Sequence, residues 1–437
     1  MNSFSEISLK DAVSFVVDNR GRSVPVQDVG IPLISTACIS NEELHPDLST
    51  ERYVSDEIYR NWFRSHPQPG DIILTNKGSK NGEIALVPDP VNFCIAQDMV
   101  ALRANSNLIS PAYLFAILRS RLVQLRIKAL NVDAVIPHFK KTDFDKLLIP
   151  LPSRRDQDFI GRVYLDISKK IELNRKTNET LEAMAKALFK SWFVDFDPVK
   201  AKAEGRPTGL PAEISDLFPD SIEDSELGEI PSGWQCSPLA DRAIYLSRGI
   251  SPVYCEEGGV LVLNQKCVRD SRISFEKARR HDTTRKQIIG REVRRFDALV
   301  NSTGVGTLGR VAMMPICQEE VVVDSHVTVV RGSNEQESFF ISSTLLNRQT
   351  EIEALGEGST GQTELSRVVL GSVPVIFPSP QLISAYFDFA FIIQDKIEKN
   401  DQASVALASA RDALLPKLIS GEIRIPDAEG ILEEVGI

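Results

Sequence analysis

The chain has 437 residues, of which 42% are hydrophobic and 25% are charged, and its formal net charge is −10. This length exceeds what one hydrophobic core supports, and the composition is that of a globular protein, so we expect at least two domains. No apolar run approaches the roughly 20 residues of a membrane span, and the first residues lack the pattern of a secretory signal, so we expect a cytoplasmic protein without a membrane partner.

Residues 1–152 predict a strand-rich α+β domain. Short β-branched runs, such as 71–75 and 83–87, are bounded by Gly, Asn or Pro, which is typical of strands. A glycine turn at 78–82 separates these two strands, and the apolar stretch 113–130 predicts a helix in the same domain.

Residues 153–194 predict a long helix. Two prolines precede it, and Ser153 with Asp156 has the spacing of a capping box. Apolar or small polar residues then recur at alternating intervals of three and four, which is the a/d seam of a coiled coil. The seam positions are Tyr164, Ile167, Ile171, Asn174, Asn178, Leu181, Ala185, Leu188 and Trp192.

Residues 195–233 predict an acidic linker. Acidic residues outnumber basic ones by seven in this stretch, which is rich in Pro and Gly and lacks a long periodic pattern. Such a composition indicates a connector, and we expect no more than one short helix within it.

The rest of the chain repeats the first part at an offset of 226 residues. Residues 234–378 predict a second α+β domain, 379–420 a second long helix, which Pro416 should kink or end near its last turns, and 421–437 a C-terminal tail. The second seam consists of Ala390, Ile393, Ile397, Asn400, Ser404, Leu407, Arg411, Leu414 and Leu418.

Two arrangements of the long helices fit this pattern. Each helix packs on its own domain, or the two pack on each other as an antiparallel pair whose register is fixed by a buried contact between Asn174 and Asn400. We favour the pair. Its candidate interface residues are Ile167, Ile171, Asn174, Leu181, Leu188, Ile393, Ile397, Asn400, Leu407 and Leu414.

Motifs for catalysis are missing from the sequence. The run GVGTLG at 304–309 has the glycine spacing of a dinucleotide site, but a strand-like segment follows it where a helix is required, so we interpret it as a glycine hairpin. There is no P-loop, no nucleophile elbow, no acid-x-Lys nuclease core and no Asn-Pro-Pro methyltransferase motif. The six cysteines and five histidines show no metal-ligand spacing. We therefore expect no catalytic residue, no metal site and no cofactor in this chain.

Local basic clusters point to nucleic acid. Residues 266–295 hold eleven Lys or Arg against four acids, and basic and amide side chains surround the glycine turn at 78–82. Such groups neutralise phosphates and read base edges, although a solvated surface that balances nearby acids is the alternative. The candidate DNA-facing residues are Lys77, Lys80, Asn81, Arg279, Arg280, Asn301, Thr303 and Thr307.

The combination of segments resembles the specificity subunits of type I restriction-modification systems. The resemblance covers the whole chain and is carried by IPLPSRRDQDFIGRV (149–163), KIELNRKTNETLEAMAKALFKSWFVDF (170–196), LGEIPSGW (227–234) and LLPKLISGEI (414–423). It implies two tandem, pseudo-symmetric target-recognition domains, each followed by a long helix, with the helices forming an antiparallel coiled coil that spaces the two domains. Such a subunit is not an enzyme.

The same resemblance implies the partners. Two methyltransferase subunits, then restriction subunits, would assemble on the chain at a bipartite site in double-stranded DNA, and S-adenosylmethionine, ATP and magnesium would belong to those subunits. Exposed residues such as Trp192 and Phe193, together with the seam, would hold the helix pair and the methyltransferase subunits. Two other classes remain open from the residues alone: a DNA-modifying enzyme whose motifs are unrecognised, and a coiled-coil scaffold that does not bind DNA.

Overall fold

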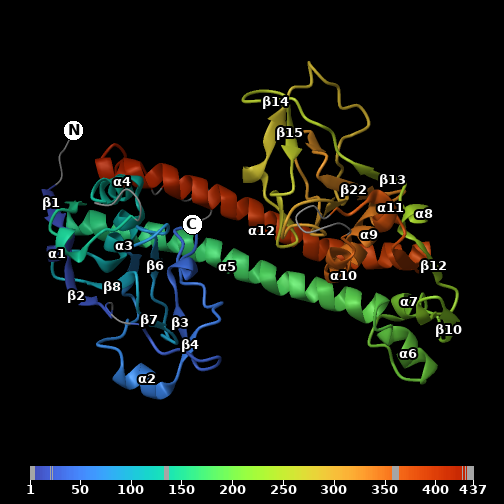
Figure 1. Ribbon diagram of the computed structural model, residues 1–437, viewed down its shortest axis with the longest axis horizontal. Helices are drawn as coiled ribbons and strands as arrows, with labels where there is room; N and C mark the ends of the chain where they lie inside the picture. The colour runs from blue at the N-terminus through green and yellow to red at the C-terminus, as the bar shows by residue number, and fades with distance from the viewer. Residues whose placement is uncertain are drawn as a thin grey trace. The chain divides into compact units, whose positions relative to one another are not determined.

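The computed structural model describes residues 5–19, 21, 23–131, 137–356, 364–425, 427–428 and 430. The chain forms two compact units, of which unit 1 is Met1–Thr177 with Asn400–Ile437 and unit 2 is Asn178–Lys399. The long helices α5 (Arg154–Phe193) and α12 (Pro380–Ser420) each contribute to both units (Figure 1). Each unit is therefore completed by part of the other repeat's helix. Of the predicted tail 421–437, residues 426, 429 and 431–437 lie outside the described residues.

Unit 1 is an α+β body built on a four-stranded antiparallel sheet in the order β2-β8-β5-β6. A second sheet has the order β4-β3-β7, with β3 and β7 parallel, and β1 pairs with β9. Its strands are β1 (Ser5–Ser8), β2 (Val13–Val17), β3 (Ile31–Ile34), β4 (Tyr53–Val54), β5 (Ile72–Thr75), β6 (Ile84–Leu86), β7 (Cys94–Ile95), β8 (Met99–Ala104) and β9 (Leu148–Leu151). Its shorter helices are α1 (Leu9–Ala12), α2 (Asp56–Asn61), α3 (Pro111–Arg119) and α4 (Arg121–Ala129).

The apolar stretch 113–130 forms two helices instead of the single one predicted. Ser120 separates α3 from α4 because its backbone is extended and its hydroxyl accepts the N–H of Val123 at 3.3 Å, which starts a new helix. Six consecutive residues of α3 are buried, so α3 lies inside unit 1 and not on its surface.

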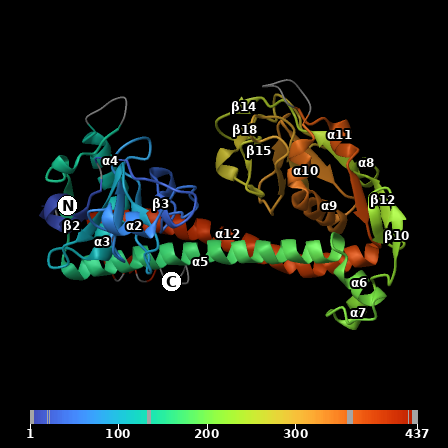
Figure 2. The same cartoon turned by 60° about the horizontal axis from the view of Figure 1, so that its bottom comes forward.

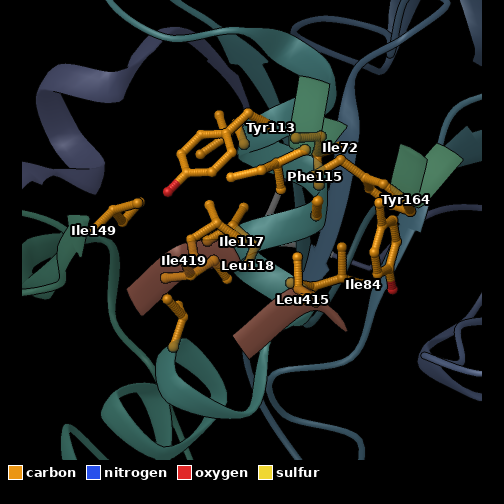
Figure 3. Close-up of a cluster of buried hydrophobic side chains, with 14 of the residues drawn as sticks. Ile72, Ile84, Tyr113, Phe115, Ile117, Leu118, Ile149, Tyr164, Leu415 and Ile419 are labelled. Atoms are coloured by element: carbon orange, nitrogen blue, oxygen red, sulfur yellow. The ribbon is translucent and has the colours of Figure 1, made fainter. Parts of the chain in front are cut away.

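Segments of both long helices pack into the core of unit 1. Phe159, Ile160 and Ile167 of α5 share one buried cluster with Leu415 and Ile419 of α12. Figure 3 labels Tyr164 of α5 with Leu415 and Ile419 of α12 among the side chains of this cluster. Gly161 lets α5 approach α3 closely, since a Cβ there would lie 2.5 Å from the backbone nitrogen of Tyr113. As predicted, the Ser153 hydroxyl caps the start of α5 by accepting the N–H of Asp156 at 3.2 Å.

Within unit 1 the two helices run antiparallel. The carboxamide of Asn174 donates to the carbonyl of Asn400 at 3.4 Å and to the hydroxyl of Ser404 at 3.1 Å, whereas Tyr164, earlier in α5, meets the guanidinium of Arg411, later in α12, at 5.4 Å. This ring contact also explains how a charged residue occupies the seam. The predicted buried contact between Asn174 and Asn400 is present, and it joins the carboxamide of Asn174 to the backbone carbonyl of Asn400. α12 continues for about one turn beyond Pro416 and ends at Ser420, so the proline lies near the end of the helix, as the sequence predicts.

Unit 2 repeats the plan of unit 1 (Figure 2). Its four-stranded antiparallel sheet has the order β13-β22-β19-β20, a second sheet has the order β14-β18-β15-β21, and β12 pairs with β23, β10 with β11 and β16 with β17. The strands are β10 (Ile222–Ser225), β11 (Gly228–Pro231), β12 (Gln235–Pro238), β13 (Tyr245–Arg248), β14 (Tyr254–Cys255), β15 (Val260–Leu263), β16 (Val268–Arg269), β17 (Arg272–Ile273), β18 (Arg279–His281), β19 (Ala298–Asn301), β20 (Val311–Met313), β21 (Val321–Val323), β22 (Val327–Arg331) and β23 (Pro374–Phe377). The shorter helices are α6 (Asp197–Ala203), α7 (Ala212–Ser215), α8 (Leu239–Arg242), α9 (Glu335–Asn347), α10 (Gln349–Ala354) and α11 (Arg367–Gly371).

The stretch predicted as an acidic linker, 195–233, has more structure than expected. It contains α6, α7 and the β10–β11 hairpin, and Phe218 and Val199 are buried in the core of unit 2. Its acidic composition hid these elements, because only a few apolar residues anchor them.

Trp192 and Phe193 correct the prediction that they are exposed. They are 2% and 6% exposed, and the Trp192 ring contacts Phe218 and Phe389, at 5.2 and 6.0 Å between ring centroids. Phe193 meets Tyr386 of α12 at 5.1 Å. The end of α5 therefore packs against the start of α12, antiparallel within unit 2 as well, and these aromatic rings form core instead of a docking surface.

Each unit clamps the start of its central strand with an ion pair whose carboxylate is buried. Asp71 precedes β5 and accepts two bonds from Arg103 of β8, both at 2.9 Å. Asp297 precedes β19 and accepts two bonds from Arg331 of β22, at 2.8 and 2.6 Å. The same bidentate pair at the same place confirms the duplication at the level of side chains. The predicted fold class, two tandem α+β domains with a pair of long helices, is confirmed.

Candidate nucleic-acid interface

The glycine turn between β5 and β6 presents one exposed cation. Lys77 is exposed, with its ammonium 4.0 Å from the carboxylate of Asp98, and Lys80 is half-buried. Asn81 is engaged internally, since its amide group donates to Asn131 at 2.7 Å and its carbonyl oxygen accepts the N–H of Phe139 at 3.3 Å. Of the three candidates at this turn, Lys77 is exposed, Lys80 is half-buried and Asn81 is bonded within the unit.

A polar cavity of about 630 Å³ adjoins the same end of β5. It is lined by Asp18, Gly21, Ser23, Arg64, Asn76, Lys77, Gln97, Asp98 and His138. Two cations and two carboxylates share this wall, so the cavity offers donors and acceptors together.

The GVGTLG run forms the predicted hairpin between β19 and β20. Gly304, Gly306 and Gly309 all have positive φ, which glycine adopts without strain. Asn301 is fully buried, and its amide group donates to the carbonyls of Gln265 and Thr307, both at 3.0 Å. The prediction that Asn301 faces DNA does not hold in this structure, because its side chain braces the hairpin from inside.

The threonines of this hairpin lie near its surface. The hydroxyl of Thr303 is 2.6 Å from Nδ1 of His326 and 3.2 Å from the side-chain oxygen of Gln265. The hydroxyl of Thr307 donates to the carbonyl of Thr303 at 3.5 Å, so it supports the turn. Beside them lies Asp324, and its burial raises the pKa of its carboxyl group. The backbone N–H of His326 donates to this carboxylate at 2.9 Å and partly opposes the rise.

Arg279 and Arg280 lie on β18 of the second sheet. The guanidinium of Arg279 is stacked over the ring of Tyr254, 3.3 Å from its centroid, and Arg279 is exposed. Arg280 forms an ion pair with Glu319 at 2.6 Å. Arg279 therefore presents its charge to solvent on an aromatic support, while Arg280 is partly neutralised.

Part of the basic run 266–295 is paired with acidic residues of the long helices. Arg272 pairs with Glu182 of α5 and Arg295 with Glu398 of α12, at 2.8 and 2.7 Å, all within unit 2. These arginines attach the domain body to the helices. The charge count in the sequence therefore overstates the unpaired basic charge, because these two arginines are paired with carboxylates of the helices.

The seam residues lie where the two helices meet within each unit. In unit 1, the seam residues that are buried are Ile167, Asn174, Asn400, Leu407 and Leu414. The remaining predicted positions are half-buried, except for Ile397, which is buried in unit 2; the half-buried residues are Ile171, Leu181, Leu188 and Ile393. The contact between the helices thus involves hydrogen bonds from side-chain amide groups as well as apolar packing.

Sequence reasoning missed Asp98, His138, His326 and Glu364 at the strand ends. No local motif marks them, since each is an isolated polar residue beside an apolar strand. The repeat itself carried a signal, because Glu364 follows Thr303 at the same distance in sequence as His138 follows Lys77.

No group of three or more metal-ligating side chains occurs among the residues that the structure describes. Across the same part of the chain, no helix has the length and apolarity needed to cross a membrane.

Comparison with known proteins finds similar sequences. A family model described as the type I restriction modification DNA specificity domain matches residues 27–183. The type I restriction enzyme HindI specificity subunit of Haemophilus influenzae is 22% identical over 438 residues, which span 88% of this chain and 92% of that protein. The MjaIX specificity subunit of Methanocaldococcus jannaschii is 24% identical over 412 residues, spanning 91% and 88%.

A solved structure shows the same fold. The S subunit of a type I restriction-modification system from M. genitalium superposes with a TM-score of 0.59 at 15% identity, covering 96% of this chain and 97% of that one. The chain therefore has the fold of that S subunit. In sequence, the chain is similar to type I restriction-modification specificity subunits, to the family model over residues 27–183 and to the two relatives over most of its length.

Proposed function

We propose that this chain recognises a bipartite DNA sequence for a type I restriction-modification complex, with one half-site read by each unit. The observation that supports this most is the duplicated plan: both units present a glycine hairpin and exposed polar side chains at the end of the central strand of a four-stranded sheet. A protein that reads two separate half-sites needs two such surfaces.

The long helices provide the spacing in this proposal. At about 1.5 Å per residue, the 40 residues of α5 span roughly 60 Å, which exceeds one turn of DNA of about 34 Å. Each helix packs into the cores of both units. The helix pair would thereby fix the number of unspecified base pairs between the half-sites.

The catalytic steps would belong to partner subunits. Two methyltransferase subunits that bind S-adenosylmethionine would assemble on the chain, followed by restriction subunits that hydrolyse ATP with magnesium. The candidate positions for assembly are apolar side chains of the helices that are more than half exposed, namely Leu173 and Val405 in unit 1 and Met184 and Ile392 in unit 2.

Mapping of methylated sites tests the proposal. The chain is co-expressed with a type I methyltransferase subunit in cells that lack other methyltransferases, and methylated bases are located across the genome. We expect one split motif with a constant gap. A contiguous motif, or methylation that is unchanged when the chain is omitted, would contradict it; in the second case the chain would be a scaffold that does not read DNA.

A further inference from the structure

The end of the central strand has the same hydrogen-bond register in both units. In unit 1 the N–H of Asn76 donates to the carbonyl of Asp98 at 2.9 Å, and in unit 2 the N–H of Ser302 donates to the carbonyl of His326 at 2.8 Å. Asp98 and His326 therefore occupy equivalent positions, each directly before the strand that pairs with the central one.

A third chain segment closes this edge in both units. Lys77 forms an isolated antiparallel bridge with His138, and Thr303 forms one with Glu364. One residue further along, the N–H of Phe139 donates to the carbonyl of Asn76 in unit 1. In unit 2 the N–H of Leu365 donates to the carbonyl of Ser302, and both distances are 2.9 Å. The backbone thus places three side chains alike in each unit. We call them the strand-end sets: Lys77, Asp98 and His138 in unit 1, and Thr303, His326 and Glu364 in unit 2.

The strand-end set of unit 1 faces the polar cavity of about 630 Å³. The side chains of Lys77 and Asp98 are 46% and 47% exposed, and their charged atoms are 4.0 Å apart. An exposed ion pair of this length contributes little to the stability of the fold. The ammonium and the carboxylate can therefore each leave the pair and bind a ligand instead. Asp18 and Arg64 line the same cavity, so the wall carries both signs of charge.

The strand-end set of unit 2 has different chemistry on the same backbone. The hydroxyl of Thr303 and the exposed imidazole of His326 are 2.6 Å apart. Glu364 pairs with Arg248 at 2.5 Å while its own side chain stays 54% exposed. Lysine, aspartate and histidine of one unit are thus replaced by threonine, histidine and glutamate in the other.

We infer that the two strand-end sets read base edges in the major groove of DNA, and that their different residues make the two units select different half-sites. A phosphate-binding surface would be uniformly basic, because carboxylates repel phosphate. Base edges instead display donors and acceptors side by side, which suits a set that contains both a cation and a carboxylate. This inference rests on the proposed function, since it names the reading residues within each unit.

Single substitutions that keep the backbone test the inference. Asp98 has a positive φ of 61°, a conformation that asparagine tolerates, so Asp98→Asn removes the charge without strain. His326→Gln alters the exposed donor of unit 2. Asp166→Asn makes the same chemical change as Asp98→Asn at an exposed position of α5 and serves as the matched control. Each variant is co-expressed with the methyltransferase subunit, and its methylated motif is compared with that of the unsubstituted chain.

We expect Asp98→Asn to relax or change the base preference at one or more positions in one half of the motif. His326→Gln should change the base preference in the other half only. Loss of one base-reading contact corresponds to about 5- to 150-fold lower discrimination at that base. Asp166→Asn should leave both halves as they are.

Three outcomes would overturn the inference. A split motif that both strand-end variants leave unchanged would refute these sets while the proposed function stands; absence of any split motif from the unsubstituted chain would instead refute the proposed function. If a variant gives no methylation, its purified complex is titrated with the original target and with single-base changes. A uniform loss of affinity across these DNAs, in a variant whose urea unfolding matches that of the unsubstituted chain, would indicate a phosphate contact and would exclude base reading.

Discussion

The buried clamp of unit 2 should be worth far more than its copy in unit 1. The side chains of Arg331 and Asp297 are 9% and 0% exposed, whereas Arg103 is 32% exposed beside Asp71, which is 3% exposed. Removing one partner of a buried pair leaves an unpaired buried charge, so we expect Asp297→Ala to lower the free energy of unfolding by about 3–5 kcal/mol. Water reaches Arg103, so Asp71→Ala should cost less, about 1–3 kcal/mol.

The three tryptophans allow each unit to be followed separately. Trp62 lies in unit 1, and Trp192 and Trp234 are buried in unit 2. In a Trp62→Phe background, tryptophan fluorescence during urea unfolding reports on unit 2 alone. Asp297→Ala should move this transition to markedly lower urea, and adding Arg331→Met should restore most of the loss, because no charge then remains buried.

Equal and small effects of Asp297→Ala and Asp71→Ala would refute this reasoning. So would a double variant, Asp297→Ala with Arg331→Met, that is as unstable as the sum of its two single variants. Either result would mean that the loss comes from packing and not from the isolated charge.

Three further predictions concern the hairpin, the helices and the basic turn. Gly309→Ala should destabilise unit 2 more than Gly306→Ala in urea unfolding, because both have φ above 70° but only at Gly309 would a Cβ meet backbone, at 2.5 Å from Glu353. Ile167→Ala, fully buried between α5 and the core of unit 1, should cost about 2–5 kcal/mol of unfolding free energy, whereas Leu173→Ala, 57% exposed on the same helix, should stay within about 0.5 kcal/mol. Lys80→Gln should weaken DNA binding equally for all sequences and reduce the slope of log affinity against log salt by about one, as titrations at several salt concentrations would show.

Much of the fold was predictable because the chain repeats itself. The offset of 226 residues in the sequence links the strands, the glycine hairpins and the seam residues of the two halves, and periodic patterns report directly which face of a helix is apolar. The cap at Ser153 and the hairpin at 304–309 followed from local chemistry, which depends only on neighbouring residues.

Partners distant in sequence were not predictable. Trp192 and Phe193 appeared to be exposed aromatic residues at a helix end, yet rings from α9, α12 and the former linker segment bury them. Asn301 looked like a reader of bases beside a glycine turn, but its amide satisfies two carbonyls inside the hairpin. In each case the outcome depends on which groups tertiary packing brings to the side chain.

The same limit applies to charge. The arginines of 266–295 count as a basic run in sequence, but Arg272 and Arg295 turn toward acids on the two helices. The sequence does not show which charged side chains form ion pairs within a unit and which, like those of the strand-end sets, remain exposed. The tertiary structure is needed to tell them apart.

The spacing of the half-sites gives the most direct test of a chain that reads two half-sites at once. DNA targets are made that carry the mapped split motif with the natural gap and with one base pair added to or removed from it, and methylation by the complex is measured at equal concentrations. We expect strong methylation only at the natural gap, with a large loss for a change of one base pair in either direction. Equal methylation across all three gaps would contradict reading of two half-sites at a fixed spacing.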